Sequence, residues 1–198
     1  MESNKAGRRR GAVLENAILD AAWTELEQVG YFGLTMEAVA TRSGTSRSVV
    51  NRRWPSRAAL AAAAMARFVE LHPILVPDRG AIRTELIELL HQISDRGVPV
   101  LVRLVLDMRD DLGTENSSPA DLKERFVEDD LVDKILERGI SRGEVDPSRV
   151  TTRIKTLPTD LVRHDAIMTL KTLSHDAILR IVDDIFLPLV ANSPTRMS

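Results

Sequence analysis

Apolar residues recur along most of the chain at spacings of three and four, which is the period of amphipathic helices. The pattern begins after residues 1–11, which lack an apolar face and are expected to form a flexible basic arm. It then places Leu14, Ile18 and Leu26 on one side of a predicted helix. Gly30 is expected to end that helix, because glycine readily adopts the backbone conformation that follows a last helical turn.

The next stretch predicts two short helices and a longer one. Thr35 is a candidate N-cap for the first, and Gly44 breaks that helix. Ser46 is a candidate N-cap for the second, which Pro55 ends by forcing the preceding residue out of helical geometry. Ser56 then caps a helix that runs to about residue 70. Two short helices around a glycine turn, braced by longer ones, are typical of a helix-turn-helix.

The rest of the chain also predicts helices. Residues 71–80 contain two prolines and are expected to form a hinge or linker. Residues 98–106 are apolar almost throughout and are compatible with a strand, but length and neighbours favour a buried helix. The predicted fold class is therefore all-α, with further amphipathic helices at about 81–96, 98–111, 119–142, 148–171 and 175–191.

Composition excludes several classes of protein. Hydrophobic residues make up 43% of the 198, which is enough for a core, while aromatic residues are only 4%. No cysteine is present, which excludes disulfide scaffolds, thiol catalysis and cysteine-ligated zinc. The N-terminus has no apolar segment typical of a signal peptide, and residues 58–66 are too short to span a bilayer. We expect a cytoplasmic protein with no membrane partner.

Charge is distributed unevenly. Residues 1–70 hold ten Lys and Arg against seven Asp and Glu, whereas the whole chain has a net charge of −2. Five arginines gather between residues 42 and 57, a stretch without acids. The basic residues 1–70 on an otherwise acidic chain predict a polyanionic partner for that N-terminal part alone.

Residues 14–60 resemble the DNA-binding head of the TetR (tetracycline repressor-like) regulators. The resemblance is carried by "ILDAA", "LTMEAVA", "SGTSRSVV" and "PSRAAL" in register, and more weakly by "ILERGISRGEVDP" and "LSHDAILRIVDDIFLPLV" near the C-terminus. It implies a helix-turn-helix DNA-binding domain at 12–57, a ligand-binding and dimerisation domain at 58–192, and a short flexible tail at 193–198. It also implies a homodimeric transcriptional repressor that a small, largely hydrophobic ligand releases from a palindromic DNA operator.

The candidate DNA contacts follow from residue type and place. Arg47 at the start of the second short helix is suited to guanine, and Asn51, one turn later, to adenine. The family usually has Tyr where this chain has Asn51, and His where it has Arg53. Each candidate is alternatively a solvated surface residue, and arginines 8–10 are either a minor-groove arm or a solubilising tail. The full set of candidates is Thr35, Ser46, Arg47, Ser48, Asn51, Arg52, Arg53 and Arg57.

Two further sets are implied by the resemblance, and for both the alternative is ordinary core packing. The ligand pocket is expected to use Val100, Leu101, Leu104, Val105, Met108 and Phe126. The dimer interface is expected to use Ile154, Leu157, Leu161, Ile178, Ile181, Val182 and Ile185.

Two rival functions remain at this point. One is a DNA-binding activator or recruiting protein without ligand release. The other is a metal-dependent hydrolase, because "HDAI" occurs at 164–167 and again at 175–178 and His-Asp pairs can bind metals. A metal site needs at least three converging ligands, which this spacing does not supply, so we expect no enzyme activity, no metal and no cofactor.

Overall fold

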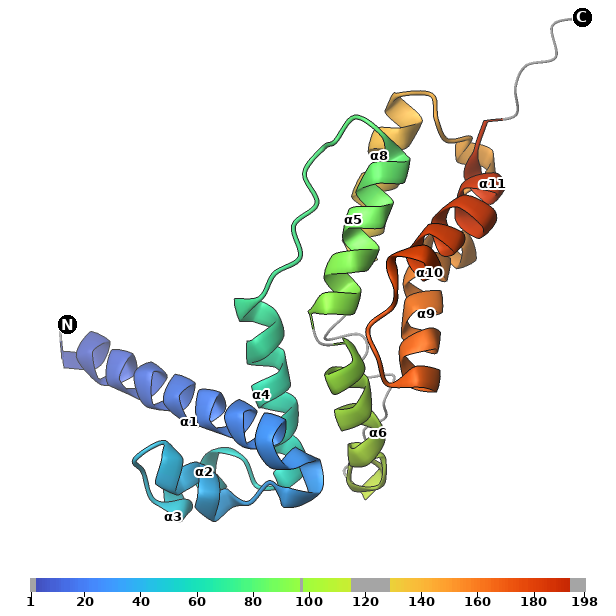
Figure 1. Ribbon diagram of the computed structural model, residues 1–198. Coiled ribbons are helices and arrows are strands. Elements are labelled where there is room, and N and C mark those ends of the chain that lie inside the picture. The colour runs from blue at the N-terminus through green and yellow to red at the C-terminus, as the bar shows by residue number, and fades with distance from the viewer. Residues whose placement is uncertain (1–2, 97, 115–128, 193–198) are drawn as a thin grey trace, which may run out of the picture. The chain divides into compact units, whose positions relative to one another are not determined.

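The computed structural model describes residues 3–96, 98–114 and 129–192, and these residues are helical apart from their connections (Figure 1). Within them the predicted all-α class is confirmed, and the only β-pairing is one isolated bridge between Val145 and Ala191. The chain divides into two compact units. One comprises residues 1–73 with 104–126, and the other comprises residues 74–103 with 127–198.

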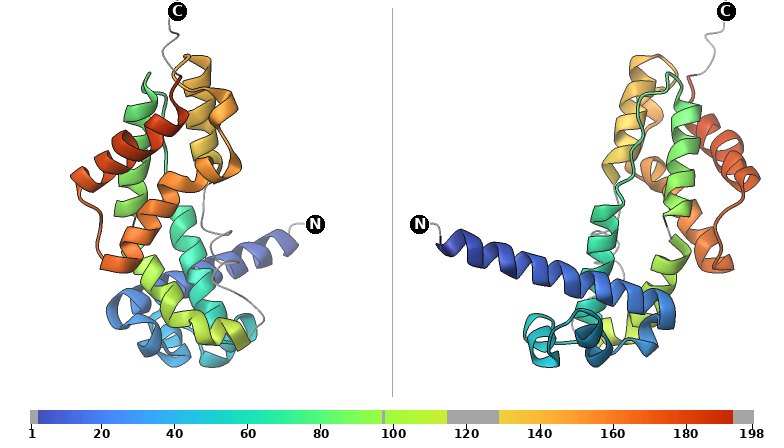
Figure 2. Two further views of the ribbon diagram at one scale, coloured as in Figure 1. Left: turned by 90° about the vertical axis from the view of Figure 1, so that its right-hand side faces the viewer. Right: turned by 60° about the vertical axis from the view of Figure 1, so that its left-hand side comes forward.

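The helices of the N-terminal part form the first unit. They are α1 (Ser3–Gly33), α2 (Met36–Arg42), α3 (Arg47–Arg53) and α4 (Arg57–Leu71). In Figures 1 and 2 α1 lies across α4, and α2 and α3 lie alongside α1. The predicted helix-turn-helix is therefore present, with α3 as the second short helix.

Local sequence signals explain the ends of these helices. Thr35 accepts a hydrogen bond from the amide of Ala38 at 3.1 Å, and Ser56 accepts one from Ala59 at 2.9 Å. Gly44 has a φ of 67°, a left-handed backbone conformation that residues with a side chain rarely adopt. It therefore permits the turn between α2 and α3. The same property of Gly30, with a φ of 70°, interrupts α1 three residues before its end.

The first helix begins earlier than the sequence suggested. Residues 1–11 were expected to form a flexible arm, but the described backbone is helical from Ser3 onward. The physical reason is that residues 3–13 contain no proline, and their lysine, alanines and arginines have good helix propensity. The side chains of residues 3–10 lie outside what the structure describes, so the proposed role of arginines 8–10 stays a prediction.

The second unit contains most of the remaining helices. They are α5 (Ile82–Asp95), α8 (Asp129–Ser141), the 3-10 turn η1 (Pro147–Arg149), α9 (Thr152–Thr169), α10 (His175–Leu179), the π-helix η2 (Arg180–Phe186) and α11 (Leu187–Val190). Another helix, α6 (Val98–Thr114), is divided by the unit boundary after Arg103. None of the described helices is long and apolar enough to cross a membrane.

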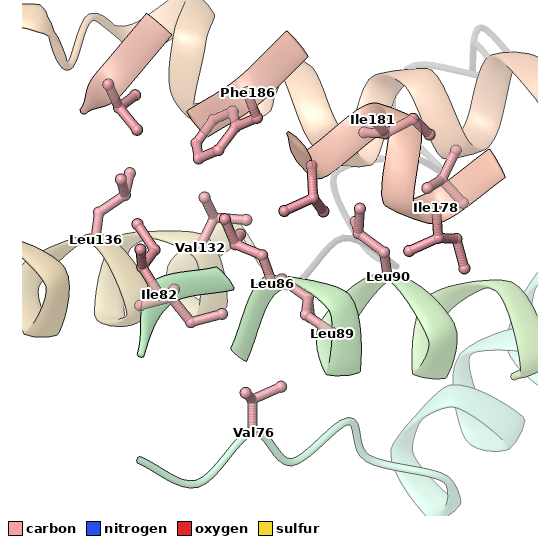
Figure 3. Packing of buried hydrophobic residues seen from close by; sticks show 14 of the residues in the cluster. Val76, Ile82, Leu86, Leu89, Leu90, Val132, Leu136, Ile178, Ile181 and Phe186 are labelled. Carbon is pink, nitrogen blue, oxygen red and sulfur yellow. The ribbon is translucent and has the colours of Figure 1, made fainter. Parts of the chain in front are cut away.

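A hydrophobic core joins α5, α8 and the C-terminal helices (Figure 3). Leu86, Leu89 and Leu90 project from α5 and are at most 1% exposed. They belong to one core with Leu136 of α8 and Phe186 of η2, both of which are buried. Burial of these large apolar side chains is the main stabilising contribution to this unit.

Three predicted dimer residues belong to this core. Ile178, Ile181 and Val182 have exposed fractions of only 0%, 5% and 0% within the single chain. That side of α10 and η2 packs on α5, so these side chains are covered without a second subunit. An apolar stripe in the sequence does not show which surface covers it, and their role at a dimer interface stays a prediction.

The other predicted dimer residues are more accessible. Ile154 and Leu161 are half-buried and pack against the same core, and Leu157 is also half-buried. Ile185 is 39% exposed, so its side chain remains available to a partner.

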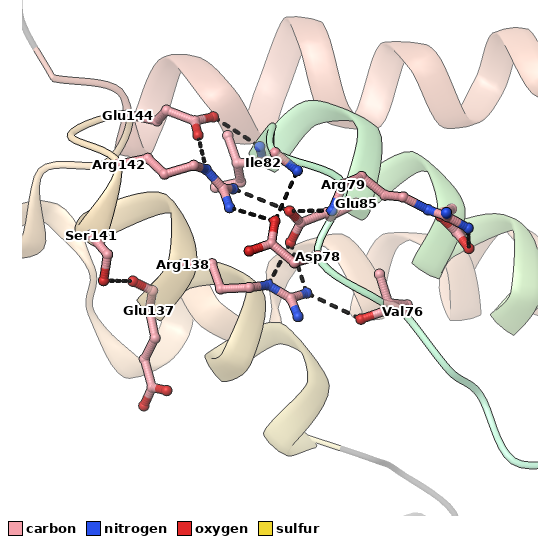
Figure 4. Close-up of polar contacts among 12 residues, drawn as sticks. Val76, Asp78, Arg79, Ile82, Glu85, Glu137, Arg138, Ser141, Arg142 and Glu144 are labelled. Atoms are coloured by element: carbon pink, nitrogen blue, oxygen red, sulfur yellow. Dashed lines mark hydrogen bonds and ion pairs between the residues drawn. The ribbon is translucent and has the colours of Figure 1, made fainter.

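A buried carboxylate organises one end of the second unit (Figure 4). Glu85 is 0% exposed and accepts a hydrogen bond from Arg138 Nε at 2.8 Å. Arg142 Nη2 lies 3.2 Å from its other oxygen, which also accepts from the Arg79 amide at 3.1 Å. A buried charge is costly unless it is paired, and here the pairing also fixes the segment before α5 against α8.

Five of the six predicted ligand residues lie on α6, on both sides of the boundary between the two units. Val100 and Leu101 fall in the second unit, whereas Leu104, Val105 and Met108 fall in the first. Leu104 and Met108 are 3% and 0% exposed, and Val100 is 41% exposed. The sixth, Phe126, lies outside the described residues.

Candidate nucleic-acid interface

Helix α3, the second short helix of the helix-turn-helix, presents most of its polar side chains to solvent. Arg47, Asn51 and Arg52 are exposed, while Val50 on the opposite side is 0% exposed and anchors the helix in the first unit. Arg47 and Asn51 are four positions apart, so they lie on one face of the helix. Both side chains are therefore accessible to a binding partner, and their role as DNA contacts stays a prediction.

The serines at the start of α3 are also exposed. Ser46 occupies the N-cap position with an extended backbone, yet its side chain makes no capping hydrogen bond. Its hydroxyl lies 2.9 Å from that of Ser48 instead. Both hydroxyls therefore sit at the accessible end of α3, next to Arg47. Thr35 is exposed as well, although its side-chain oxygen already caps α2.

Three arginines of the basic cluster are paired with acids from other helices. Arg42 Nε donates to Glu25 at 2.7 Å, and its Nη2 donates to Gln28 at 2.9 Å. Arg53 Nη1 lies 2.6 Å from a carboxylate oxygen of Glu15. The acids come from α1, the helix that lies alongside α2 and α3.

The third paired arginine is Arg57, the first residue of α4. Its Nη2 donates to Asp111 at 2.8 Å, and its guanidinium carbon lies 4.3 Å from the centre of the Tyr31 ring. Arg57 was among the candidate DNA contacts predicted from the sequence. The structure places it in a contact within the protein that no local sequence signal indicates, because Asp111 is 54 residues away.

The charges around Tyr31 support the same arrangement. Burial, together with its hydrogen bond to the Asp111 carboxylate, raises the pKa of Tyr31 to about 12. The hydrogen bonds from Arg57 and then Tyr31 hold the pKa of Asp111 below its usual value. The Asp111 hydrogen bond raises the pKa of Arg57. At neutral pH the three groups are therefore a neutral phenol, a carboxylate and a guanidinium.

Arg47 and Arg52 differ from these three arginines. Across the described ranges 3–96, 98–114 and 129–192, neither makes an ion pair, and both are exposed. An exposed arginine without an internal counter-charge can exchange its counterions for phosphate or base contacts at little cost. The arginine cluster thus divides into two free cations on α3 and three held by the protein.

Comparison with known proteins identifies the family. Residues 18–64 match the family described as bacterial regulatory proteins, tetR family. Residues 76–185 match the domain described as tetracyclin repressor-like, C-terminal domain, which alone covers more than half of the chain. The chain belongs to the TetR family. It is an HTH-type, DNA-binding transcriptional regulator, and the family is not one of enzymes, so the hydrolase alternative is set aside.

Curated relatives are similar in sequence to this chain over almost its whole length. An uncharacterized HTH-type transcriptional regulator of Mycobacterium tuberculosis (strain H37Rv) is 27% identical over 183 residues, which covers 90% of this chain and 89% of the relative. The DNA-binding transcriptional repressor TetR of Mycobacteroides abscessus is 26% identical over 184 residues, covering 91% and 96% of the two chains.

Solved structures share the fold. The TetR family transcription regulator SCO0332 superposes with a TM-score of 0.66 at 21% identity, over 90% of this chain and 99% of that one. The flavonoid-responsive regulator FrrA gives 0.59 at 18% identity, over 92% and 100%. These TetR-type structures support the helical architecture of this regulator.

The histidines of the two "HDAI" repeats do not meet in this TetR-family structure. His164 lies on α9, whereas His175 begins α10 and its Nδ1 is 2.8 Å from Nε2 of His91 on α5. No group of three or more metal-ligating side chains converges within the described residues.

Proposed function

We propose that this TetR-family regulator is a homodimeric repressor that binds a palindromic operator through α3 and that a small hydrophobic effector releases it. The observation that carries the DNA-binding part is the pair of exposed, unpaired arginines on α3. Arg47 with Asn51 contacts base edges in the major groove, and Arg52 binds a phosphate. Thr35, Ser46 and Ser48 add hydroxyl contacts to the DNA backbone.

The dimer part of the proposal keeps the accessible members of the set predicted from the sequence and adds Leu189. Ile185 and Leu189 are 39% and 41% exposed, lie four positions apart, and form an apolar ridge on η2 and α11. Leu157 of α9 is half-buried, so part of its side chain is also accessible. Exposed apolar side chains at helical spacing favour contact with a second copy, and a two-fold dimer matches two operator half-sites.

Repression is the direction of regulation that we propose, because the relative from Mycobacteroides abscessus is named as a repressor. A repressor of this kind acts in the cytoplasm on chromosomal DNA. The effector is proposed to be a small, largely hydrophobic molecule, as the family resemblance implies. It releases DNA only to the extent that it binds the DNA-free conformation more tightly.

A reporter experiment tests the direction. The DNA upstream of the regulator's own gene is fused to a reporter, and wild type is compared with Arg47→Ala in a host that lacks the regulator. Repression predicts that wild type lowers the reporter signal and that Arg47→Ala does not. A signal that rises with wild type would favour an activator or recruiting protein.

A second experiment tests the effector. A panel of apolar and aromatic small molecules is screened for compounds that raise the melting temperature of the protein. Compounds that do so are expected to dissociate the gel-shifted operator complex as well. A compound that stabilises the protein yet leaves the complex intact would contradict release by that ligand.

A further inference from the structure

Asp111 on α6 connects two segments that frame the helix-turn-helix. It accepts a hydrogen bond from the hydroxyl of Tyr31, 80 residues earlier, and another from Arg57 at 2.8 Å. Tyr31 lies in the last turn of α1, just before α2, and Arg57 begins α4, just after α3. The carboxylate therefore ties the segment that enters the motif to the segment that leaves it.

The Arg57 side chain is held on more than one side. Besides its ion pair with Asp111, it covers the Tyr31 ring at 4.3 Å, and its Nη1 lies 3.5 Å from the carbonyl oxygen of Phe32. The Tyr31 ring beneath it is only 1% exposed. Moving Arg57 out to a phosphate would cost the ion pair and the ring contact together.

The division of the chain into units agrees with this role. Residues 104–126 cluster with residues 1–73, so the part of α6 that carries Asp111 belongs to the same compact unit as α1 to α4. Leu104, Met108 and Leu112 of that part are each at most 3% exposed. The C-terminal half of α6 is thus a packed component of the DNA-binding unit.

We propose that Asp111 is a positioning residue for operator binding, which acts through Arg57 and Tyr31 to fix α1 and α4 on either side of α2 and α3. It makes no contact with DNA itself. Arg57 likewise serves as an internal partner of Asp111 and not as a phosphate contact. The proposal concerns operator affinity alone, so it does not depend on repression or on an effector.

A double-mutant cycle on operator affinity tests the proposal. Asp111→Asn and Arg57→Gln are each expected to weaken binding by about three- to tenfold, and the double variant by no more than either, because residues that act as one unit are not additive. Asp110→Asn is the matched control. It removes the same charge from the neighbouring residue, whose side chain is 89% exposed, and is expected to bind like wild type.

Salt dependence separates positioning from direct contact. If Arg57 only positions the motif, Arg57→Gln leaves the slope of affinity against salt unchanged, while loss of a true phosphate contact lowers that slope by about one. The proposal is overturned if Arg57→Gln lowers the slope. It is also overturned if Asp111→Asn binds the operator as tightly as wild type or more tightly.

Hydrogen exchange provides a readout that needs no DNA. In the free protein the amides of residues 104–112 are expected to exchange faster in Asp111→Asn than in Asp110→Asn, and Tyr31→Phe should give the same direction. Operator binding to wild type should slow exchange in this segment, although it lies outside α3, and Asp111→Asn should lose that effect. Equal exchange in the Asp111 and Asp110 variants would refute the proposal, whether or not an operator is found. Failure to find an operator would instead count against the proposed repressor function.

Discussion

Arg53 and Glu15 form an ion pair with a nitrogen-to-oxygen distance of 2.6 Å, across 38 residues of sequence. The preceding arginine, Arg52, is exposed and has no such partner within the described residues. Two adjacent arginines at the end of α3 therefore differ in how much of their charge is available to DNA. This difference provides a matched pair of substitutions.

We predict that Arg52→Ala weakens binding to all sequences alike and lowers the salt slope by about one, because it removes a free phosphate contact. Arg53→Ala should lower the slope less, because Glu15 already offsets much of the charge of Arg53. Fluorescence anisotropy with labelled operator at several salt concentrations measures both. Equal reductions for the two variants would contradict the division of the cluster into free and held arginines.

Arg47 and Asn51 should determine sequence preference. Arg47→Ala is expected to cost about 1–3 kcal/mol on the best operator and to relax preference at one base pair, with Asn51→Ala relaxing it at another. Competition with operators changed at single positions measures the effect. A loss of the same size on every sequence would assign both side chains to the DNA backbone.

The apolar ridge on η2 and α11 should control whether the protein forms a dimer. The double variant Ile185→Glu with Leu189→Glu is expected to shift the protein to a monomer that retains its helical circular dichroism. Ile178→Ala, in contrast, creates a cavity in the core and should lower the free energy of unfolding by about 2–5 kcal/mol. Sedimentation equilibrium and denaturant unfolding distinguish the two effects. A monomeric wild type, or a double variant that stays dimeric, would refute this interface.

Glu85 should be a major determinant of the stability of the second unit. Glu85→Gln leaves Arg138 and Arg142 facing a neutral group, and loss of one buried partner typically costs about 3–5 kcal/mol. Glu88→Gln is the control, because its ion pair with Arg79 is solvent-screened and a much smaller effect is expected. Urea unfolding of both variants measures the difference. Similar losses of unfolding free energy in the two variants would show that burial does not strengthen the ion pairs of Glu85.

The contribution of Asp111 to the free energy of unfolding should decrease at acidic pH. Its pKa is lowered in the folded state by Arg57 and Tyr31, so its stabilising contribution is present above the unfolded value of about 3.9 and is lost as the pH falls through the folded pKa. The difference in unfolding free energy between wild type and Asp111→Asn should be constant near neutral pH and shrink below about pH 4. Urea titrations at a series of pH values test this, and a difference that persists undiminished at pH 2 would contradict it.

Helix caps and turns, which depend on residues close in sequence, could be predicted from the sequence. Thr35, Gly44 and Ser56 carry their capping and turn preferences in their own chemistry, so the helix-turn-helix could be placed to within a few residues. The exposure of Arg47 and Asn51 follows from the same helical period, since Val50 takes the buried side.

What depends on distant parts of the chain was not predicted. Asp111 has no local signal that directs it to Arg57, and Glu15 has none that directs it to Arg53, because ion pairs between helices are set by tertiary packing. The burial of Ile178 and Val182 within their own chain was not predicted for a similar reason. Periodicity shows that one side of a helix avoids water, but it does not show whether its own chain or a second copy covers that side.

Footprinting on the DNA upstream of the regulator's own gene tests the central claim most directly. The account predicts that wild type, at moderate salt, protects a pseudo-palindrome whose half-sites lie about 34–36 Å apart, or a multiple of that. Arg47→Ala should lose this protection, and Asp110→Asn, a change of an exposed charge on α6, should keep it. A wild-type protein that protects no defined site, or an Arg47→Ala variant that protects the same site equally well, would contradict operator recognition through α3.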